Sequence, residues 1–350
     1  MGPACVADAK VLGVVTTVCV IAMCYVYTVI RPFDDVITAW RYSDHWRMST
    51  KRLFAPPRIK STFTSLHADW DLVPQSWINE MEARRRHLEN ACAAAEPPSN
   101  NSLVKASHNL YVDERHRLII CEIPKVGCSN FNRLLYGLSA NIGIDEYENI
   151  NGSQVHSFRM LRWLRKLDSF SDFGIQFRLK HYLKVIAVRH PFERIVSAYR
   201  SKLEGGDREF SATYGPAILK YERKKKTEEV IRHYNVSFAA FARYLTQISV
   251  QTNFHFKAYH EICFPCTVHY DVIARHETIS RDVSMVLKMI HAAPGFHYPN
   301  SHRVKVHSED VWKSYFKHMT KEEVWQFWDT QFETDGRLFN YTMPNDIGKS

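Results

Sequence analysis

Two short segments combine cations and hydroxyls in the way that a site for phosphate groups requires. Residues 124–130 read PKVGCSN, in which Lys125 supplies a mobile cation and Ser129 a hydroxyl. Residues 189–202 read RHPFERIVSAYRSK and begin with Arg189. The guanidinium of an arginine can bind two phosphate oxygens at once through a bidentate contact. The lysine and the hydroxyl suit a phosphate whose bridging oxygen gains charge as a bond breaks. Together, the two segments predict a site for a phosphorylated ligand.

Each segment lies between a predicted strand and a predicted helix. An apolar strand spans 118–123 and helical spacing follows over 131–138, while a second strand spans 182–188 and a helix follows over 192–202. A loop in this position presents backbone N–H groups and the helix dipole to an anion, and Gly127 lets the backbone approach closely. Two such units predict an α/β fold with a central parallel sheet and helices on its faces.

Each segment alone is also consistent with a structural role that involves no ligand. Residues 124–130 could form an ordinary strand-to-helix turn, and Arg189 could pair with Glu193 on the surface while Ser197 packs within its helix. A kinase-like phosphoryl transferase is disfavoured, because the loop lacks the Gly-x4-Gly-Lys-Ser/Thr of a Walker A sequence and no Asp-based magnesium site is evident. The presence of both segments, each after a strand, favours the phosphate site.

The chain is basic, with a formal net charge of +9. This charge favours anionic partners such as a nucleotide, a phospholipid or an acidic polysaccharide. There is no Arg/Lys-rich arm, aromatic RNA-binding signature or zinc-finger spacing, so no nucleic-acid partner is predicted. Cys263 and Cys266 could form half of a zinc site, but no second cysteine pair at finger spacing accompanies them, and no metal is predicted.

The N-terminal region contains a candidate membrane anchor. Residues 11–30 include no charged residue and, at 20 residues, are long enough to cross a bilayer as a helix. The alternative is a cleaved signal peptide, whose apolar region is typically shorter and is followed by a small-residue cleavage site. Flanking charges leave the orientation open. Four sequons for N-glycosylation, which occurs in the secretory lumen, follow the span and favour a luminal body; they are Asn100, Asn151, Asn235 and Asn340.

The remaining chain divides at a linker-like stretch after Ala93. Residues 77–95 are predicted to form a surface or self-associating helix outside the catalytic core, which leaves a homodimer open. Five of the eight cysteines lie beyond the anchor, so at least one should stay free or pair between chains in an oxidising compartment. Beyond residue 205 the pattern is mostly helical. The expected order is a cytosolic tail (1–10), a transmembrane anchor (11–30), a luminal stem (31–105) and a catalytic domain (106–345).

The two loops together resemble the 5′-phosphosulfate loop and the 3′-phosphate motif of the carbohydrate sulfotransferases. The likeness is strongest to the Golgi family that contains chondroitin 4-O-, N-acetylgalactosamine 4-O- and HNK-1 sulfotransferases, and it covers roughly residues 116–342. Four further segments carry it in the same order: YGPAILKYERKKKTEE (214–229), FAAFARYL (238–245), NFHFKAYHEICFPCTVHYDVIARHETI (253–279) and YFKHMTKEEVWQFWDTQFETDGRLFNY (315–341).

The resemblance implies a P-loop-like sulfotransferase domain that uses 3′-phosphoadenylyl sulfate (PAPS) as sulfuryl donor, without a metal, in a Golgi type II membrane protein. It implies that Lys125 contacts the 5′-phosphosulfate and that Arg189 and Ser197 hold the 3′-phosphate. A disulfide or a fixed loop is expected at residues 263–266. The other residues that the two motifs assign to the donor are Pro124, Val126, Gly127, Cys128, Ser129, Asn130, His190, Pro191, Phe192, Glu193, Arg194, Ile195 and Val196.

Transfer to a sugar hydroxyl requires a proton acceptor, and histidine suits this role near neutral pH. His156 lies between the two motifs, where the family also tends to carry histidine, and we expect it to act as the base; His255 is the alternative and a candidate acceptor contact. Alternatively, His156 and His255 could each be a structural or surface histidine without a catalytic role. The sequence departs from the family at His190, where an acidic residue is frequent, and at 254–256, where Phe-His-Phe replaces an acidic-His-Trp pattern.

The predicted reaction is sulfation of the 4-hydroxyl of N-acetylgalactosamine in chondroitin or dermatan. A glucuronic acid of the HNK-1 type or an N-glycan N-acetylgalactosamine is the alternative acceptor, and a membrane-anchored lectin for acidic glycans is the non-enzymatic alternative. A basic cluster would guide such a polyanionic glycosaminoglycan or glycoprotein glycan, although it could also be a solvated helix face. The cluster consists of Arg223, Lys224, Lys225 and Lys226.

Overall fold

The computed structural model describes residues 68–95, 101–140, 142–157, 163–205, 207–223, 235–248, 253–299 and 309–349. The predicted cytosolic tail, the predicted anchor at 11–30 and most of the predicted stem lie outside these residues. Among the helices that are described, none has the length and apolarity needed to cross a bilayer.

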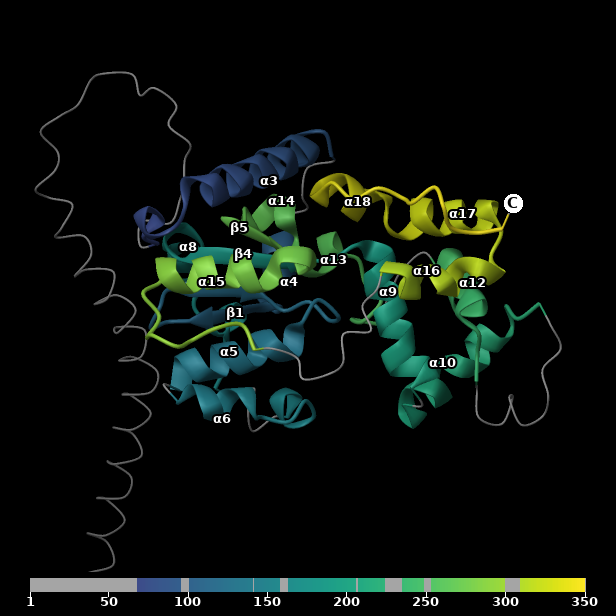
Figure 1. The fold of residues 1–350 in the computed structure, drawn as a ribbon, viewed down its shortest axis with the longest axis horizontal. Helices are drawn as coiled ribbons and strands as arrows, with labels where there is room; N and C mark the ends of the chain where they lie inside the picture. The colour runs from purple at the N-terminus through teal and green to yellow at the C-terminus, as the bar shows by residue number, and fades with distance from the viewer. Residues whose placement is uncertain are drawn as a thin grey trace, which may run out of the picture. The chain divides into compact units, whose positions relative to one another are not determined.

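The core of the domain is a five-stranded mixed sheet in the order β3-β1-β2-β4-β5 (Figure 1). The strands are β1 (Leu110–Asp113), β2 (Leu118–Cys121), β3 (Arg165–Lys166), β4 (Leu183–Val188) and β5 (Val272–Arg275). Strands β2, β4 and β5 run parallel, and β1 pairs antiparallel with both β2 and β3. Every residue of β2 and β4 is buried, as expected for strands covered on both faces.

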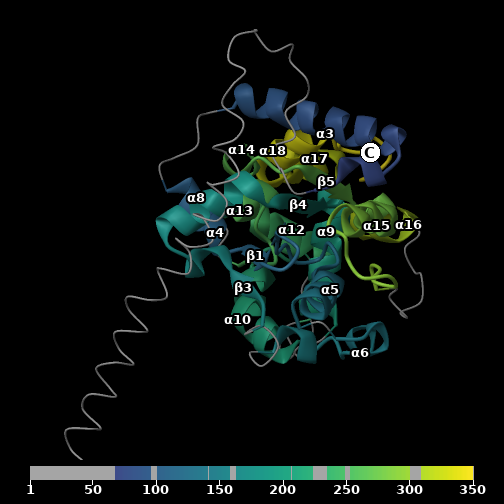
Figure 2. The same cartoon turned by 90° about the vertical axis from the view of Figure 1, so that its left-hand side faces the viewer.

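The two predicted strand–loop–helix units are confirmed. Helix α5 (Cys128–Ala140) follows β2, and α9 (Pro191–Tyr199) follows β4 with proline in its first turn. Figure 2 shows helices on either side of the sheet. The parallel centre agrees with the predicted fold class. The described chain beyond residue 205 is mostly helical, as expected, apart from the four-residue strand β5.

Helices supply the rest of the described structure. Those before β4 are η2 (Trp70–Leu72), α3 (Gln75–Ala93), α4 (Ser102–Ser107), α6 (Ile144–Glu148), η3 (Gln154–His156), η4 (Leu167–Ser169) and α8 (Asp172–His181). Those after α9 are the π-helical turn η5 (Arg200–Glu204), α10 (Arg208–Leu219), α12 (Phe238–Gln247), α13 (Tyr259–Cys263), α14 (Pro265–Val268), η6 (His276–Thr278), α15 (Ile279–Met289), α16 (Glu309–Ser314), η7 (Tyr315–His318), α17 (Lys321–Gln331) and α18 (Glu333–Phe339).

Helix α3 belongs to the folded domain rather than to a separate stem. It lies beside the edge strand β5 (Figures 1 and 2), and its Trp77 and Met81 are buried in the main core. A disulfide joins Cys92 at its end to Cys266, and a second joins Cys121 of β2 to Cys263. The predicted boundary near residue 105 is therefore wrong, because the apolar face of α3 covers an otherwise open sheet edge.

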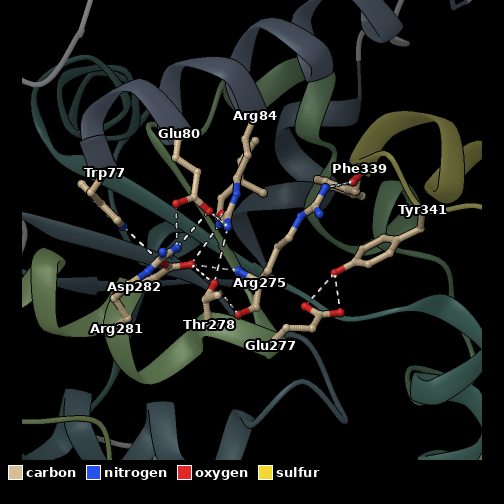
Figure 3. Close-up of polar contacts among 11 residues, drawn as sticks. Trp77, Glu80, Arg84, Arg275, Glu277, Thr278, Arg281, Asp282, Phe339 and Tyr341 are labelled. Atoms are coloured by element: carbon tan, nitrogen blue, oxygen red, sulfur yellow. Dashed lines mark hydrogen bonds and ion pairs between the residues drawn. The ribbon is translucent and has the colours of Figure 1, made fainter. Parts of the chain in front are cut away.

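A buried carboxylate fixes α3 to the domain (Figure 3). The side chain of Asp282 in α15 is fully buried and accepts hydrogen bonds from Trp77 Nε1 at 3.0 Å, Arg84 Nη1 at 2.9 Å and Thr278 Oγ1 at 2.7 Å. These bonds hold the pKa of Asp282 below its usual value although burial opposes this. The carboxylate thus joins α3, η6 and α15 at one point.

A second apolar cluster fills the helical region formed by α9, α10, α12, η7 and α17. It is rich in aromatic rings, and Phe192 at its centre packs against Phe316 and Phe327 with centroids 4.5 Å and 5.8 Å away. Because α9 borders both this cluster and the sheet, the residues at its start are held from two sides.

We predict that Asp282→Ala destabilises the protein by about 3–5 kcal/mol, because it leaves the largely buried Arg84 guanidinium without its carboxylate. Chemical denaturation of the full chain would measure the effect. Glu80→Ala is the matched control, since Glu80 is a more exposed partner of Arg84 and should contribute under about 1 kcal/mol. Equal losses for the two variants would contradict a role specific to Asp282.

Candidate active site

The loop between β2 and α5 has a constrained backbone. Lys125 and Gly127 both adopt positive φ angles, 71° and 95°. A Cβ atom at residue 127 would lie 2.0 Å from Tyr298 Oη and 3.3 Å from Tyr298 Cζ, so only glycine fits there. The 298–299 segment also accepts a hydrogen bond from Asn130 through the Pro299 carbonyl, at 2.9 Å. Sequence reasoning missed Tyr298, because nothing local marks a tyrosine 171 residues away as a neighbour of the loop.

Arg194 in α9 fixes the position of this loop through hydrogen bonds to the backbone. Its side chain is almost completely buried; Nε donates to the Pro124 carbonyl at 3.0 Å and Nη1 donates to the Lys257 carbonyl at 2.6 Å. The guanidinium also lies 4.9 Å from the ring centroid of Tyr259. Arg194 was predicted as a donor-binding residue; the structure shows that it positions the backbone of two segments.

Arg189 follows β4 directly and lies against the same loop. Its Nη1 donates to the Lys125 carbonyl at 3.2 Å, and its Nη2 pairs with Glu193 one helical turn later. The backbone of Arg189 is fixed by Tyr259, whose hydroxyl accepts from the Arg189 N–H and donates to its carbonyl. The pair with Glu193 is largely buried rather than a surface contact. Ser197, one further turn along α9, is half-buried.

His156 is brought to the loop by η3. Its Nε2 lies 2.9 Å from Ser129 Oγ, and its Nδ1 lies 3.5 Å from Asn132 Nδ2. Burial lowers the pKa of His156, and the positive charges of Arg133, Lys125 and Lys202 lower it further, against the opposing effect of Glu122. The ring is therefore neutral near pH 7. Because Asn132 Nδ2 only donates, Nδ1 is the unprotonated ring atom that can accept a proton.

His255 lies in the same electrostatic environment. Burial, followed by the charges of Lys202 and Lys125, lowers its pKa to about 4. Its Nδ1 is 3.2 Å from Asn253 Oδ1, an oxygen that only accepts, so the proton resides on Nδ1 and leaves Nε2 unprotonated. Both histidines predicted from sequence are thus near the loop, but only His156 has a described hydrogen bond to it.

The site concentrates positive charge. Burial lowers the pKa of Lys125, and Lys202, Arg189 and Arg194 repel its ammonium group and lower the pKa further. Arg189 Nε and Arg194 Nη2 are buried and have no hydrogen-bond partner among the described residues. Several cations in one place, with unsatisfied donors between them, fit a multiply charged anion. These observations support an anionic donor at this site.

His190 has a different environment from the one expected. It precedes α9, where its Nδ1 accepts from the Phe192 N–H at 3.3 Å and its Nε2 donates to the Thr342 carbonyl at 3.1 Å. Its ring stacks on Trp312 with centroids 5.1 Å apart. Pro191, Phe192, Ile195 and Val196 are likewise buried packing residues.

The basic cluster, the sequon asparagines and the cysteines that the sequence singled out do not form one site. Arg223 pairs with Glu323 at 2.6 Å, and the other members of the basic cluster, Lys224, Lys225 and Lys226, lie outside the described residues. Asn151, Asn235 and Asn340 are exposed, and Asn100 lies outside the described part. The described segments contain no group of side chains that could hold a metal ion. Cys263 and Cys266 each join a distant cysteine, and Cys128 is the free cysteine of the described chain.

Comparison with known proteins assigns the family. The model of the sulfotransferase family matches residues 108–342, so the chain belongs to this family. Carbohydrate sulfotransferase 11 of Rattus norvegicus is 31% identical over 273 residues, which cover 75% of this chain and 76% of the relative. Carbohydrate sulfotransferase 9 of Homo sapiens is 34% identical over 274 residues, which cover 75% of this chain and 60% of the relative.

The protein is therefore a carbohydrate sulfotransferase. Carbohydrate sulfotransferase 8 of Mus musculus is a further relative, 30% identical over 304 residues, which cover 83% of this chain and 67% of the relative. No solved structure matches the chain. The family requires a sulfuryl donor, and the concentrated cations around Lys125 suit the negative charge of such a donor.

We predict that Gly127→Ala severely weakens nucleotide binding, because the new methyl group clashes with Tyr298 and the φ angle is strained for any side chain. Equilibrium binding of 3′,5′-diphosphoadenosine to the full chain would measure this. Adding Tyr298→Phe removes the closest atom and should restore part of the affinity. A double variant no better than Gly127→Ala would assign the whole defect to backbone strain.

Proposed function

We propose that the protein transfers a sulfuryl group from PAPS to the 4-hydroxyl of N-acetylgalactosamine in chondroitin or dermatan. The observation that carries the proposal is the convergence of Lys125, buried Arg189 and neutral His156 on one constrained loop. Each corresponds to a group that sulfuryl transfer needs, namely a cation at the bond that breaks, an anchor for the nucleotide and a proton acceptor.

The chain's own residues have distinct roles in this proposal. Lys125 stabilises the negative charge that develops on the leaving phosphate, and Arg189 binds the 3′-phosphate together with Ser197. His156 takes the proton of the acceptor hydroxyl; its lowered pKa keeps the ring unprotonated near pH 7, and Ser129 orients it. PAPS supplies an activated sulfuryl group on a phosphate leaving group.

We further propose a Golgi membrane location, with the catalytic domain in the lumen behind one N-terminal anchor. Two disulfides between residues more than 140 positions apart fit an oxidising compartment. Three exposed sequon asparagines fit glycosylation there. The apolar run at 11–30 would supply the anchor.

The acceptor is tested directly by incubating the full chain with labelled PAPS and a panel of desulfated glycosaminoglycans. Disaccharide analysis of the products gives the sugar and the position of the new sulfate. Label on the 4-hydroxyl of N-acetylgalactosamine supports the proposal. Label only on glucuronic acid, or only on an N-glycan, would assign one of the alternative acceptors, and no label on any glycan would reject the proposed reaction.

We predict that Lys125→Ala and Arg189→Ala both impair transfer, but in different parameters. Arg189→Ala should weaken 3′,5′-diphosphoadenosine binding about ten- to a hundredfold, because a buried charged contact is lost. Lys125→Ala should chiefly lower turnover. Arg115→Ala, in the exposed turn at the opposite end of β2, is the matched control. Normal nucleotide affinity and normal turnover in both variants would refute the donor assignment.

We predict that turnover falls as pH drops below the ordinary histidine value of about 6.5. The neutral ring is the active form, and a lowered pKa keeps it neutral to lower pH, so the decline should begin below this value rather than above it. His156→Ala should reduce turnover by about 10²–10⁴ and abolish this acid limb while nucleotide binding stays normal. If His255→Ala has this effect instead, the base is His255.

A further inference from the structure

A cavity of about 420 Å³ lies next to the donor loop and takes no part in the contacts described above. It is bordered by the β1–β3 side of the sheet, visible in Figure 2, and by the segment that carries His255. The lining residues are Asn109, Tyr111, Glu122, Leu164, Lys166 and Phe254.

The strand register places three of these side chains on one face of the sheet. Tyr111 is the direct partner of both Ile120 and Lys166, so Tyr111 and Lys166 point the same way. Glu122 is two residues beyond Ile120 and therefore shares that face. Lys166 Nζ and Glu122 Oε2 are 3.9 Å apart, which is longer than a hydrogen bond.

Two lining residues of the cavity lie close in sequence to groups with proposed roles in transfer or acceptor binding. Glu122 is three residues before Lys125 in the chain, and its charge acts on His156, whose pKa it raises against the larger effect of burial. Phe254 directly precedes His255. A molecule in the cavity would thus contact residues that lie just before the phosphosulfate loop and His255 in the chain.

The chemistry of the lining differs from that of the donor site. The ammonium group of Lys166 lies near the Glu122 carboxylate and 5.2 Å from the Tyr111 ring centroid, and the 40% exposure of the side chain leaves it accessible to a ligand from the solvent side. The Glu122 carboxylate would accept hydrogen bonds from hydroxyl groups. Tyr111 and Phe254 add aromatic surface, against which the C–H face of a sugar ring packs. One cation, one carboxylate and two rings fit a sugar that carries both a carboxylate and hydroxyls.

We propose that this cavity binds a hexuronate unit of the acceptor glycan, with Lys166 holding its carboxylate and Glu122 accepting from its hydroxyls. The assignment rests on the proposed function, because the cavity acts as an acceptor subsite only if the protein sulfates a glycan. Lys166 is a specificity-determining residue in this arrangement, since it selects a uronate over a neutral sugar next to the sulfated one.

The test measures equilibrium binding of two desulfated chondroitin oligosaccharides to the full chain in the presence of 3′,5′-diphosphoadenosine. One oligosaccharide is native and the other has its uronate carboxylates reduced to alcohols. Lys166→Ala should weaken binding of the native oligosaccharide about ten- to a hundredfold and leave binding of the reduced one unchanged. Lys166→Arg should retain most of the affinity, because it keeps the charge.

Lys288→Ala, which removes an exposed lysine of α15, is the matched control and should bind both oligosaccharides as the unmodified protein does. The proposal is overturned if Lys166→Ala leaves native binding unchanged, weakens both oligosaccharides equally, or if the unmodified protein binds neither. Transfer of label from PAPS is measured on the same samples. Carboxylate-dependent binding without any transfer would reject the proposed reaction while leaving the uronate site in place.

Discussion

The site depends on the contact of Arg194 with two backbone carbonyls. One buried guanidinium holds Pro124, next to Lys125, and Lys257, two residues after His255. Two segments that are more than 130 residues apart in sequence are therefore fixed to the same helix. A buried cation requires compensating partners, and these carbonyls, the Tyr259 ring and the nearby Asp335 stabilise the Arg194 charge.

Helix α9 packs beside both apolar clusters, and this packing holds Arg194 in place. Ile195 and Phe192 are fully buried, and Phe192 is surrounded by aromatic rings from α17 and η7. Cores of this density do not deform continuously, so the start of α9 has little freedom to move. Arg189 and Arg194 keep their positions although the site around them is strongly positive. Such preorganisation is what electrostatic catalysis requires, because donors already in place need no rearrangement during the reaction.

The sequence predicted the parts of the protein whose cause is local. Strands β2 and β4 are apolar runs, α5 follows a loop that contains Gly127, and α9 begins at Pro191, so each signal lies within a few residues of the element that it predicts. Tyr298 and the edge strand β5 could not be predicted in this way. Their roles come from contacts made across the fold, and a four-residue strand has too little pattern to stand out from helical surroundings.

Two charged residues have partners that the sequence did not indicate. Helix α3 looked like a stem because many charges cover it, yet Arg84 among these charges is the partner of buried Asp282. Arg194 lies within a predicted phosphate motif, and two of its nitrogen atoms donate to backbone carbonyls. Sequence shows that a residue is charged but not whether its partner is solvent, ligand or protein, and only the fold decides this.

The free thiol of Cys128 bears on how the disulfides form. It lies seven residues from Cys121, which is joined to Cys263, so an attacking sulfur is close in sequence to a bond that it could rearrange. Burial raises the pKa of Cys128, which keeps the group protonated near pH 7. Exchange proceeds through the thiolate, and a protonated thiol attacks slowly. Once the loop has folded, its environment therefore slows any attack of Cys128 on the Cys121–Cys263 disulfide.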